Sequence, residues 1–406
     1  MIRNLSASLL IPALLLAQSS SPPLWPGARY TSADRDAAIE RGLAFIYREA
    51  SQPEVFADYG HDLLWCFYTI SATAKNPKLR AMAHKMGRER AMEYRRIHAS
   101  LAADEDADGL ANLVYGYDAA ARLGVPDAAM KHQLREAAAR YSAVDFLAFD
   151  ATREPPPSDI PLACSKCQRT NERGATVCRY CAEPLKMRDR YDIWSDALIT
   201  SYTGDIYGVM LGAHYPDVIR WINVMRPYPP RATLDTPSFY NVAYAITHVV
   251  YTLNDYGMHL LSPDWLRPEY QYLKTNLEEA VKLDDSETLG EFLDTLRAFG
   301  MTENDSLIRF GVDYLLAHQN ADGSWGDPAE TDPYDRYHST WTAVDGLRLY
   351  GWHGTRLSFP GLLKLIATPR TTTAGSLSYR HGLRAQSFRQ GGPQAPGRCH
   401  RRVSAD

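Results

Sequence analysis

The feature that most constrains the fold is a regular alternation between two kinds of helical segment along residues 34–350. The first kind is amphipathic and rich in charge, as expected for a helix with one exposed face. Its members span residues 35–50, 78–100, 127–147, 215–226, 264–282 and 303–319. The second kind is more apolar and aromatic, and its members span residues 61–75, 109–123, 192–212, 239–258, 285–299 and 337–350. Six exposed helices that alternate with six buried ones predict an all-α fold, an (α/α)6 toroid with an outer and an inner ring.

The connections between these segments indicate which end of the toroid is open. Links that leave a buried segment are short and carry proline or glycine, as at Asn76-Pro77 and Ser262-Pro263, positions where a missing N–H is tolerated. Most links that enter a buried segment are longer, and residues 148–191 form the longest. In an alternating toroid the long loops lie at one end, beside the N-termini of the inner helices. We therefore expect the mouth and the functional groups at that end.

The size and charge of the chain narrow the possibilities further. A chain of 406 residues, 45% of them hydrophobic, is long enough for one large core. We expect the toroid at residues 30–368, with a small insertion at 160–185. Residues 369–406 lack periodicity, which predicts a disordered tail or the product of a frameshift or truncated gene. The formal net charge of -4 offers no basic face for nucleic acid.

The first residues are typical of an export signal. Arg3 precedes an apolar run that ends near Ala17, and a run of this length is too short to span a bilayer. This predicts a signal peptide at residues 1–18 and a periplasmic or extracellular location. Leu15 fits the cleavage pattern poorly, so an uncleaved membrane anchor is the alternative. No other segment is apolar enough to cross a membrane.

Two CxxC pairs predict a metal site in the long 148–191 link. Cys164, Cys167, Cys178 and Cys181 have the spacing with which four thiolates close around Zn²⁺ in a zinc ribbon. Four cysteine ligands leave no open coordination position, which indicates a structural metal. In an exported protein, two disulfides are the alternative reading.

Residues 309–326 carry a resemblance to a known superfamily. Their pattern is similar to the QW repeat of squalene and terpenoid cyclases, and the matching residues are Gly311, Tyr314, Leu315, Gln319, Gly323 and Trp325. A degenerate copy lies at residues 41–46. In those families the repeat ties an outer helix to the following turn, so the resemblance implies a fold and no particular chemistry.

Residues 335–347 resemble the last inner helix of protein prenyltransferase β subunits, where a D-x-Y-H-T-type segment supplies a zinc-ligand histidine. The resemblance places His338 at that position. In the same families the inner helix before it begins with a zinc-ligand Asp and Cys, and Asp284 and Ser286 stand there. Squalene-hopene-type cyclases have a D-x-D-D-T/S motif at such a start, but Lys282 replaces its first acid. Ser286 argues against a prenyltransferase zinc site, and Lys282 weakens the cyclase reading.

These considerations make Asp284, Asp285 and His338 the candidate catalytic residues. An Asp pair beside a histidine can share protons, so that one group stays protonated for general-acid catalysis. Alternatively, these residues and Glu287 could hold a second divalent metal through O and N ligands. The competing explanation for the acids is helix capping, with Asp284 and Glu287 as a capping box. Capping does not explain a histidine near a helix N-terminus.

The candidate substrate-binding residues lie on other buried segments. Polar groups recur near the starts of these segments, and Tyr240, Tyr244 and His248 share one helical face. The alternative is a core stripe that contains a hydrogen-bonded histidine. The full set of candidates is His61, Asp62, Asp196, Tyr240, Tyr244 and His248.

Three functions remain open at this point. The first is a cyclase- or isomerase-like enzyme that acts on a hydrophobic or cyclic small molecule. The second is an exported lyase or hydrolase of (α/α)6 type that acts on an oligosaccharide. The third is a non-catalytic module whose mouth loops bind a protein partner. A deep dry cavity would favour the first, an open polar groove the second and a filled centre the third.

Overall fold

The computed structural model describes residues 30–367, and the fold over these residues is all-helical, as the sequence predicts. The predicted signal peptide and the predicted tail lie outside the described residues. In chain order the α-helices are α1 (Ser32–Glu49), α2 (Pro53–Thr73), α3 (Pro77–Ile97), α4 (Ala107–Arg122), α5 (Ala128–Ala138), α6 (Ala143–Leu147), α7 (Arg190–Tyr207), α8 (Tyr215–Ile219), α9 (Ile222–Met225), α10 (Thr236–Leu253), α11 (Arg267–Lys282), α12 (Ser286–Ala298), α13 (Ser306–Ala317), α14 (Pro333–Leu347) and α15 (Leu363–Ala367). Two short 3-10 helices, η1 (Arg231–Thr233) and η2 (Pro360–Leu362), complete the set.

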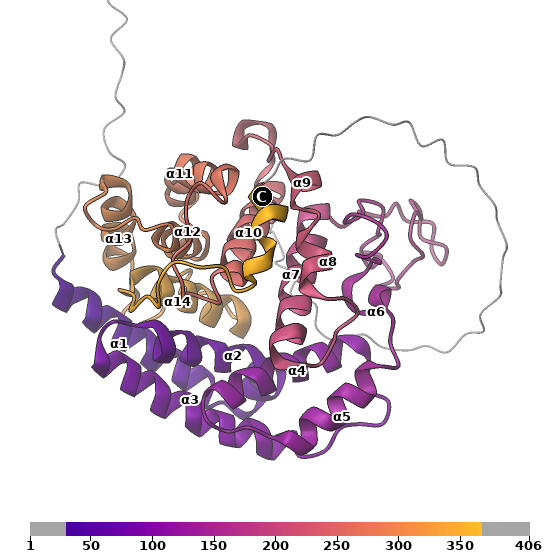
Figure 1. Cartoon of the computed structure of the whole chain (residues 1–406), viewed down its shortest axis with the longest axis horizontal. Helices are drawn as coiled ribbons and strands as arrows, with labels where there is room; N and C mark the ends of the chain where they lie inside the picture. Colours follow the sequence, from indigo (N-terminus) through magenta and orange to yellow (C-terminus); the bar gives the residue numbers. More distant parts are fainter. Residues whose placement is uncertain (1–29, 368–406) are drawn as a thin grey trace, which may run out of the picture.

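Six of the helices within residues 30–367 follow one another in a cycle of contacts. Helix α2 packs against α4, α4 against α7, α7 against α10, α10 against α12, and α12 against α14. Helix α14 contacts α2, which closes the cycle. The remaining long helices pack on this series: α3 against α2, α5 against α4, and α11 and α13 against α12. Helix α1 lies along α14, whereas the last described helix, α15, lies near α9 and α10 and accepts a hydrogen bond from Asn223 of α9 (Figure 1). We refer to the six helices of the cycle as the inner helices.

The burial of each helix follows from its place in this arrangement. All thirteen residues of α12 are buried, because α10, α11, α13 and α14 surround it. Helix α3 has charged residues over most of its surface and buries only a narrow stripe that includes Leu79, Ala83 and Gly87, as expected for a helix that packs on one side.

Several boundaries differ from those expected from the sequence. Helix α2 begins at Pro53 instead of residue 61, since proline is well tolerated in the first turn of a helix. The expected helix over residues 127–147 is two helices, because Ser142 and Asp145 form a capping box that starts α6. As a result of the first difference, His61 and Asp62 lie in the third turn of α2 and not at its start.

The segment that resembles the QW repeat connects three helices. Gln319 donates hydrogen bonds of 2.9 Å to the carbonyl oxygens of Ala38 in α1 and of Gly323. The indole N–H of Trp325 donates to the carbonyl oxygen of Leu315 in α13 at 2.7 Å, and the ring is 1% exposed. The backbone N–H of Trp325 donates to the hydroxyl of Thr340 in α14. The segment therefore anchors α13 to α1 and α14 and has a structural role.

Candidate functional site

One face of five inner helices reaches water although their other faces are buried. The partly or fully exposed residues recur at spacings of three and four, which is one helical face. They are His61 and Asp62 in α2; Asp108, Ala111, Asn112 and Tyr115 in α4; Asp192, Asp196, Ile199 and Thr200 in α7; Tyr240, Asn241, Tyr244, His248 and Tyr251 in α10; and Tyr334, Asp335 and His338 in α14. Because the helices that carry them form a cycle of contacts, we infer that these side chains bound one common space, which we call the central cavity.

Asp196 illustrates the character of this space. Its side chain is 64% exposed, and yet the surrounding protein raises the pKa of its carboxyl group to about 6. Burial of the charge is the largest cause, the guanidinium of Arg188 opposes it, and the charges of Asp192 and Asp108 add to it. A carboxylate that is accessible to water and yet surrounded by protein is expected on a concave part of the surface.

An ion pair between α12 and α14 is the central element of the site. Nδ1 of His338 lies 3.3 Å from Oε1 of Glu287, and the hydroxyl of Tyr244 donates to the same oxygen at 2.7 Å. The two ionic side chains are 15% and 7% exposed. Although burial disfavours the imidazolium, the negative charge of Glu287 beside it raises the pKa of His338 to about 9. His338 is therefore protonated at neutral pH.

The local sequence explains how this pair is held. Glu287 lies in the first turn of α12, where the helix dipole favours a carboxylate. The ring of His338 is stacked on Tyr334, with centroids 4.8 Å apart, and meets the edge of Trp341. The rotamer of the imidazole is thus fixed from two sides by aromatic packing within α14.

A second carboxyl group lies one turn further along α12. Glu291 is 3% exposed, and its Oε2 accepts a hydrogen bond of 2.6 Å from the hydroxyl of Thr247. Burial raises the pKa of Glu291 to about 8, so this carboxyl group is largely neutral at pH 7. Sequence reasoning missed Glu291, because the same buried segment also contains Glu287 and Asp294 and nothing in the pattern distinguishes one acid from the others.

His248 on the neighbouring helix is in the opposite protonation state. Its Nδ1 donates to the carbonyl oxygen of Tyr244 at 2.6 Å when that nitrogen carries the proton. Burial lowers the pKa of His248 to about 4, and the charge of His338 contributes to this shift. The site thus combines a cationic histidine in α14 with a neutral one in α10.

The two predicted catalytic aspartates occupy other positions. Asp285 is the N-cap of α12, and its Oδ1 accepts from the backbone N–H groups of Glu287 and Thr288 at 3.0 and 3.1 Å. Asp284 precedes the cap with φ of 53° and accepts a hydrogen bond from Tyr314 of the outer helix α13. The expected capping box that starts at Asp284 is wrong, because the N-cap is one residue later. Of the three catalytic candidates, His338 is the one that the structure pairs with an acid in the cavity wall.

Helix α2 contributes the predicted residues His61 and Asp62. The hydroxyl of Tyr337 donates to Oδ2 of Asp62 at 2.8 Å, and the charge of Asp62 helps to keep His338 protonated. His61 meets the edge of Tyr115, and burial lowers the pKa of its imidazole. Tyr240 is stacked near Tyr244, with centroids 6.2 Å apart.

Aromatic rings close the cavity toward the C-terminal ends of the inner helices. Trp65 stacks on Tyr115 and contacts Tyr256, each at a centroid distance of 4.9 Å, and Tyr251 stacks on Tyr256. Beneath this layer Arg122 lies 5.3 Å from the centroid of Trp65. We call these four rings the aromatic floor.

A buried ionic network supports the floor. The Nε of Arg122 lies 3.1 Å from both carboxylate oxygens of Asp118, and its Nη1 donates to the hydroxyl of Tyr68 at 2.9 Å. Asp255 is 3.6 Å from the same guanidinium and accepts a hydrogen bond from Tyr202. These contacts join α2, α4, α7 and the end of α10, so the floor rests on a network that ties four helices together.

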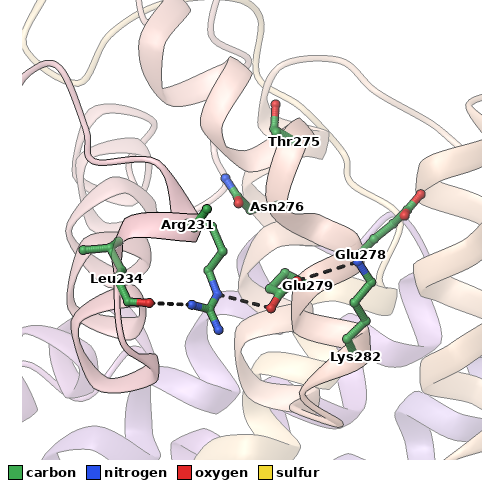
Figure 2. A pocket seen from close by; sticks show the side chains of 8 residues that line it. Arg231, Leu234, Thr275, Asn276, Glu278, Glu279 and Lys282 are labelled. Atoms are coloured by element: carbon green, nitrogen blue, oxygen red, sulfur yellow. Dashed lines mark hydrogen bonds and ion pairs between the residues drawn. The ribbon is translucent and has the colours of Figure 1, made fainter.

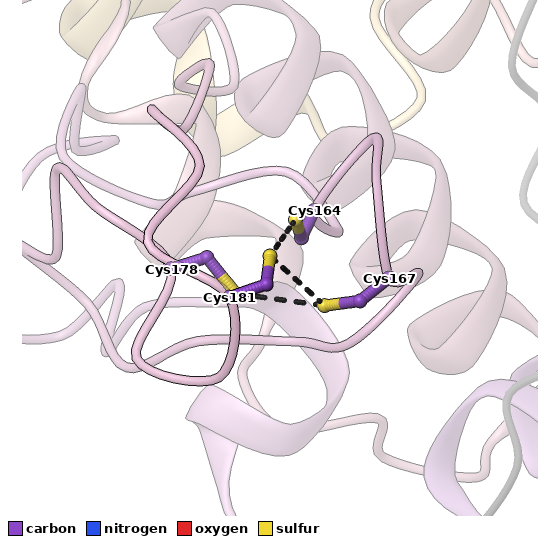
Figure 3. A group of neighbouring side chains, drawn as sticks. All are labelled: Cys164, Cys167, Cys178 and Cys181. Carbon is purple, nitrogen blue, oxygen red and sulfur yellow. Dashed lines mark hydrogen bonds between the residues drawn. The ribbon is translucent and has the colours of Figure 1, made fainter.

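The four predicted metal ligands come together in the insertion between α6 and α7 (Figure 3). Their sulfur atoms lie 3.5–3.6 Å apart in the pairs Cys164–Cys181, Cys167–Cys178 and Cys167–Cys181. These distances are far longer than a disulfide bond of about 2.05 Å. They are close to the separation of about 3.8 Å that follows from tetrahedral geometry with Zn–S bonds of about 2.3 Å.

The two halves of this cluster are built alike. The residue after each CxxC pair, Gln168 or Ala182, has positive φ and donates its N–H to the carbonyl oxygen of the first cysteine of that pair. The N–H of each first cysteine in turn donates to the second residue beyond the pair, Arg169 or Glu183. Such paired turns point four thiolates at one centre, and the residues therefore fit a bound metal ion.

Within residues 30–367, these cysteines form the one group of three or more His, Cys, Asp or Glu side chains whose ligand atoms lie near enough to share a metal. A separate groove of about 440 Å³ lies between η1 and α11, outside the central cavity (Figure 2). Three of its charged side chains are already paired: Glu279 lies 3.2 Å from Arg231 and 3.7 Å from Lys282. Because these charges neutralise one another, the groove is a weaker candidate for the functional site than the central cavity.

No helix of the described part of the chain is long and apolar enough to cross a bilayer. Comparisons of the chain with protein-family models, with curated proteins and with solved structures find no match.

Proposed function

We propose that this chain is an (α/α)6 toroid enzyme that uses general acid–base catalysis in its central cavity on a neutral, hydroxyl-rich ring compound such as an oligosaccharide. The contact cycle of the inner helices and the outer position of the others support the toroid. The observation that carries the function is the pair of His338 and Glu287, which lies at the wall of a water-accessible cavity.

The pair has the properties of a proton donor. Glu287 holds Nδ1 of the imidazolium, which leaves Nε2, on the opposite edge of the ring, for a substrate oxygen. With a pKa of about 9, His338 carries the proton that a leaving oxygen needs at neutral pH. The charge of Asp62 acts on the same imidazolium, and we assign Asp62 the role of the carboxylate that activates the attacking water.

The composition of the wall supports a carbohydrate-like substrate. Partly exposed tyrosines offer ring faces for stacking, and exposed Asp and Asn side chains offer hydrogen bonds to hydroxyl groups. The stacking candidates are Tyr115, Tyr240, Tyr244, Tyr251 and Tyr334. A cyclase that guides a carbocation would need a drier and less acidic wall than this one.

The charge of the wall argues against anionic substrates. Asp62, Asp108, Asp192, Asp196 and Asp335 face the cavity region. The cations near them are Arg188 and His338, each already paired with a carboxylate. Repulsion would therefore disfavour uronic acids and isoprenyl diphosphates.

We further propose that the metal of the four cysteines is Zn²⁺ in a structural role. Four thiolate ligands and closed coordination are typical of structural zinc, and the metal supplies no catalysis there. Export through the predicted signal peptide at residues 1–18 remains a proposal, and it would bring the enzyme to extracellular polysaccharides.

The test combines binding with hydrolysis. Purified protein is incubated with neutral oligosaccharides (gluco-, xylo-, manno- and chito-tetraose), with an oligouronate and with geranylgeranyl diphosphate. Binding is measured by calorimetry, and bond cleavage by the appearance of new reducing ends. We expect a neutral tetraose to bind and to be cleaved.

Two matched variants test whether His338 is the proton donor of the reaction. His338→Gln should reduce the rate of cleavage at neutral pH at least a hundredfold, with little change in thermal stability at pH 9.5, where most of the wild-type imidazole is neutral. His84→Gln, on the exposed surface of α3, should behave as wild type. Binding of geranylgeranyl diphosphate alone, or cleavage that survives His338→Gln, would exclude the proposed reaction.

A further inference from the structure

The metal-binding insertion joins the central cavity through a short and specific connection. Its base is closed by backbone hydrogen bonds from Leu162 to the carbonyl oxygen of Lys186 at 2.8 Å and from Arg188 to that of Ile160 at 2.7 Å. Arg188 is therefore the residue at which the insertion ends. The next residue, Asp189, caps α7 by accepting from the N–H of Tyr191.

The side chain of Arg188 belongs to the cavity wall. Its Nε lies 2.9 Å from Oδ2 of Asp192 and its Nη2 lies 2.7 Å from Oδ2 of Asp196. The guanidinium is 15% exposed, so it is held firmly between these two carboxylates. One residue thus has its backbone in the base of the insertion and its charge in the cavity.

The insertion has little besides a metal to hold it together. Between residues 162 and 187, the buried residues are Cys164 and Cys178, both of them ligands. A segment of this size without an apolar core folds when its metal binds and unfolds when the metal leaves.

We propose that metal binding by the four cysteines controls the charge of the cavity wall at α7. With the metal bound, the closed base holds Arg188 against Asp192 and Asp196. When the metal is lost, the base opens, Arg188 moves away, and Asp192 and Asp196 lose the guanidinium that neutralises them. This inference concerns the coupling of two sites and does not depend on the proposed reaction.

The coupling is measured by NMR on deuterated full-length protein with ¹³Cγ-labelled aspartate. The Asp196 signal is assigned from its loss in Asp196→Asn, and its pH titration is followed with Zn²⁺ bound and after removal of the metal by a chelator. Because Arg188 stabilises the charged carboxylate, metal removal should move the titration midpoint of Asp196 to higher pH by at least half a unit. Re-addition of Zn²⁺ should restore it.

Variants separate this coupling from general unfolding. Arg188→Met should raise the titration midpoint of Asp196 even with the metal bound. Removal of the metal from this variant should then cause no additional shift of that midpoint. Arg173→Gln, which removes an arginine that pairs with Glu154 and Asp159 at the insertion surface, should titrate as wild type with the metal bound. An unchanged midpoint after metal removal, or an equal shift in Arg188→Met, would overturn the proposal.

Discussion

Gly290 in α12 and Gly346 in α14 bring the backbones of these helices into direct contact. A Cβ atom on Gly346 would lie 2.7 Å from the carbonyl oxygen of Gly290, and a Cβ on Gly290 would lie even closer to the carbonyl oxygen of Thr342. This approach explains why Glu287 and His338, on the same two helices, are near enough to form an ion pair.

The first prediction follows from this contact. Gly290→Ala must push the two helices apart, and we expect it to lower the free energy of unfolding by about 1–3 kcal/mol, as overpacking does. Chemical denaturation with circular dichroism measures the change. Gly361→Ala is the control, because nothing lies within 4 Å of a Cβ at that position. Equal stability of the two variants would contradict the close approach.

The second prediction concerns the protonation of His338. The folded pKa of about 9 lies above the ordinary value of 6.5. Protonated His338 therefore stabilises the folded state fully below pH 6.5. This contribution to the free energy of unfolding is lost as the pH rises through 9. NMR of the protein with labelled histidine measures the titration of His338 directly. Glu287→Gln should lower the pKa of His338, because the negative charge of its partner is lost. A titration of His338 near 6.5 in the wild type would exclude the ion pair.

The third prediction concerns Glu291, whose folded pKa of about 8 exceeds its ordinary value of 4.5. The folded state holds this proton more tightly, so its contribution to stability is complete below pH 4.5 and is lost as the pH rises through 8. Glu291→Gln removes this dependence and keeps an acceptor for Thr247. The variant should gain stability over wild type as the pH rises, by at most about 1.4 kcal/mol per pH unit. Urea unfolding measures the free energy of unfolding of both proteins. If the difference between Glu291→Gln and wild type stays constant from pH 5 to 8.5, the raised pKa of Glu291 is refuted.

The fourth prediction concerns metal content. Elemental analysis should find about one zinc per chain, and Cys178→Ser should lose it, because three thiolates hold the ion far less tightly. His338→Ala should retain the full amount. If wild type contains a second metal equivalent that His338→Ala lacks, a metal centre near Asp284 and His338 would replace the acid–base assignment.

The sequence allowed the helical fold and the cysteine cluster to be predicted because both depend on local patterns. Apolar periodicity marks a helix wherever it packs, and two CxxC pairs meet once their turns form. The start of α2 at Pro53 was missed because the charged first turns look like a loop until α14 packs beside them.

Local sequence patterns could not predict the ion pair between His338 and Glu287. His338 could be identified as unusual from its position near a helix start, but its partner depends on how α12 and α14 cross. Asp284 and Asp285 looked equally suitable in sequence, and a single residue of backbone with positive φ turns Asp284 toward α13. Glu291 was missed because an acid's pKa depends on three-dimensional burial.

The contact between α1 and α14 has a consequence for how the chain reaches its folded state. During synthesis α1 emerges first, but its main partner is made only after everything from Glu49 to Pro333 has been added. Until then α2 and α3 cover only part of α1, and contacts so distant along the chain slow folding. The surface of α1 that α14 covers in the folded protein therefore stays exposed until late in translation, and a chaperone can bind the nascent chain there.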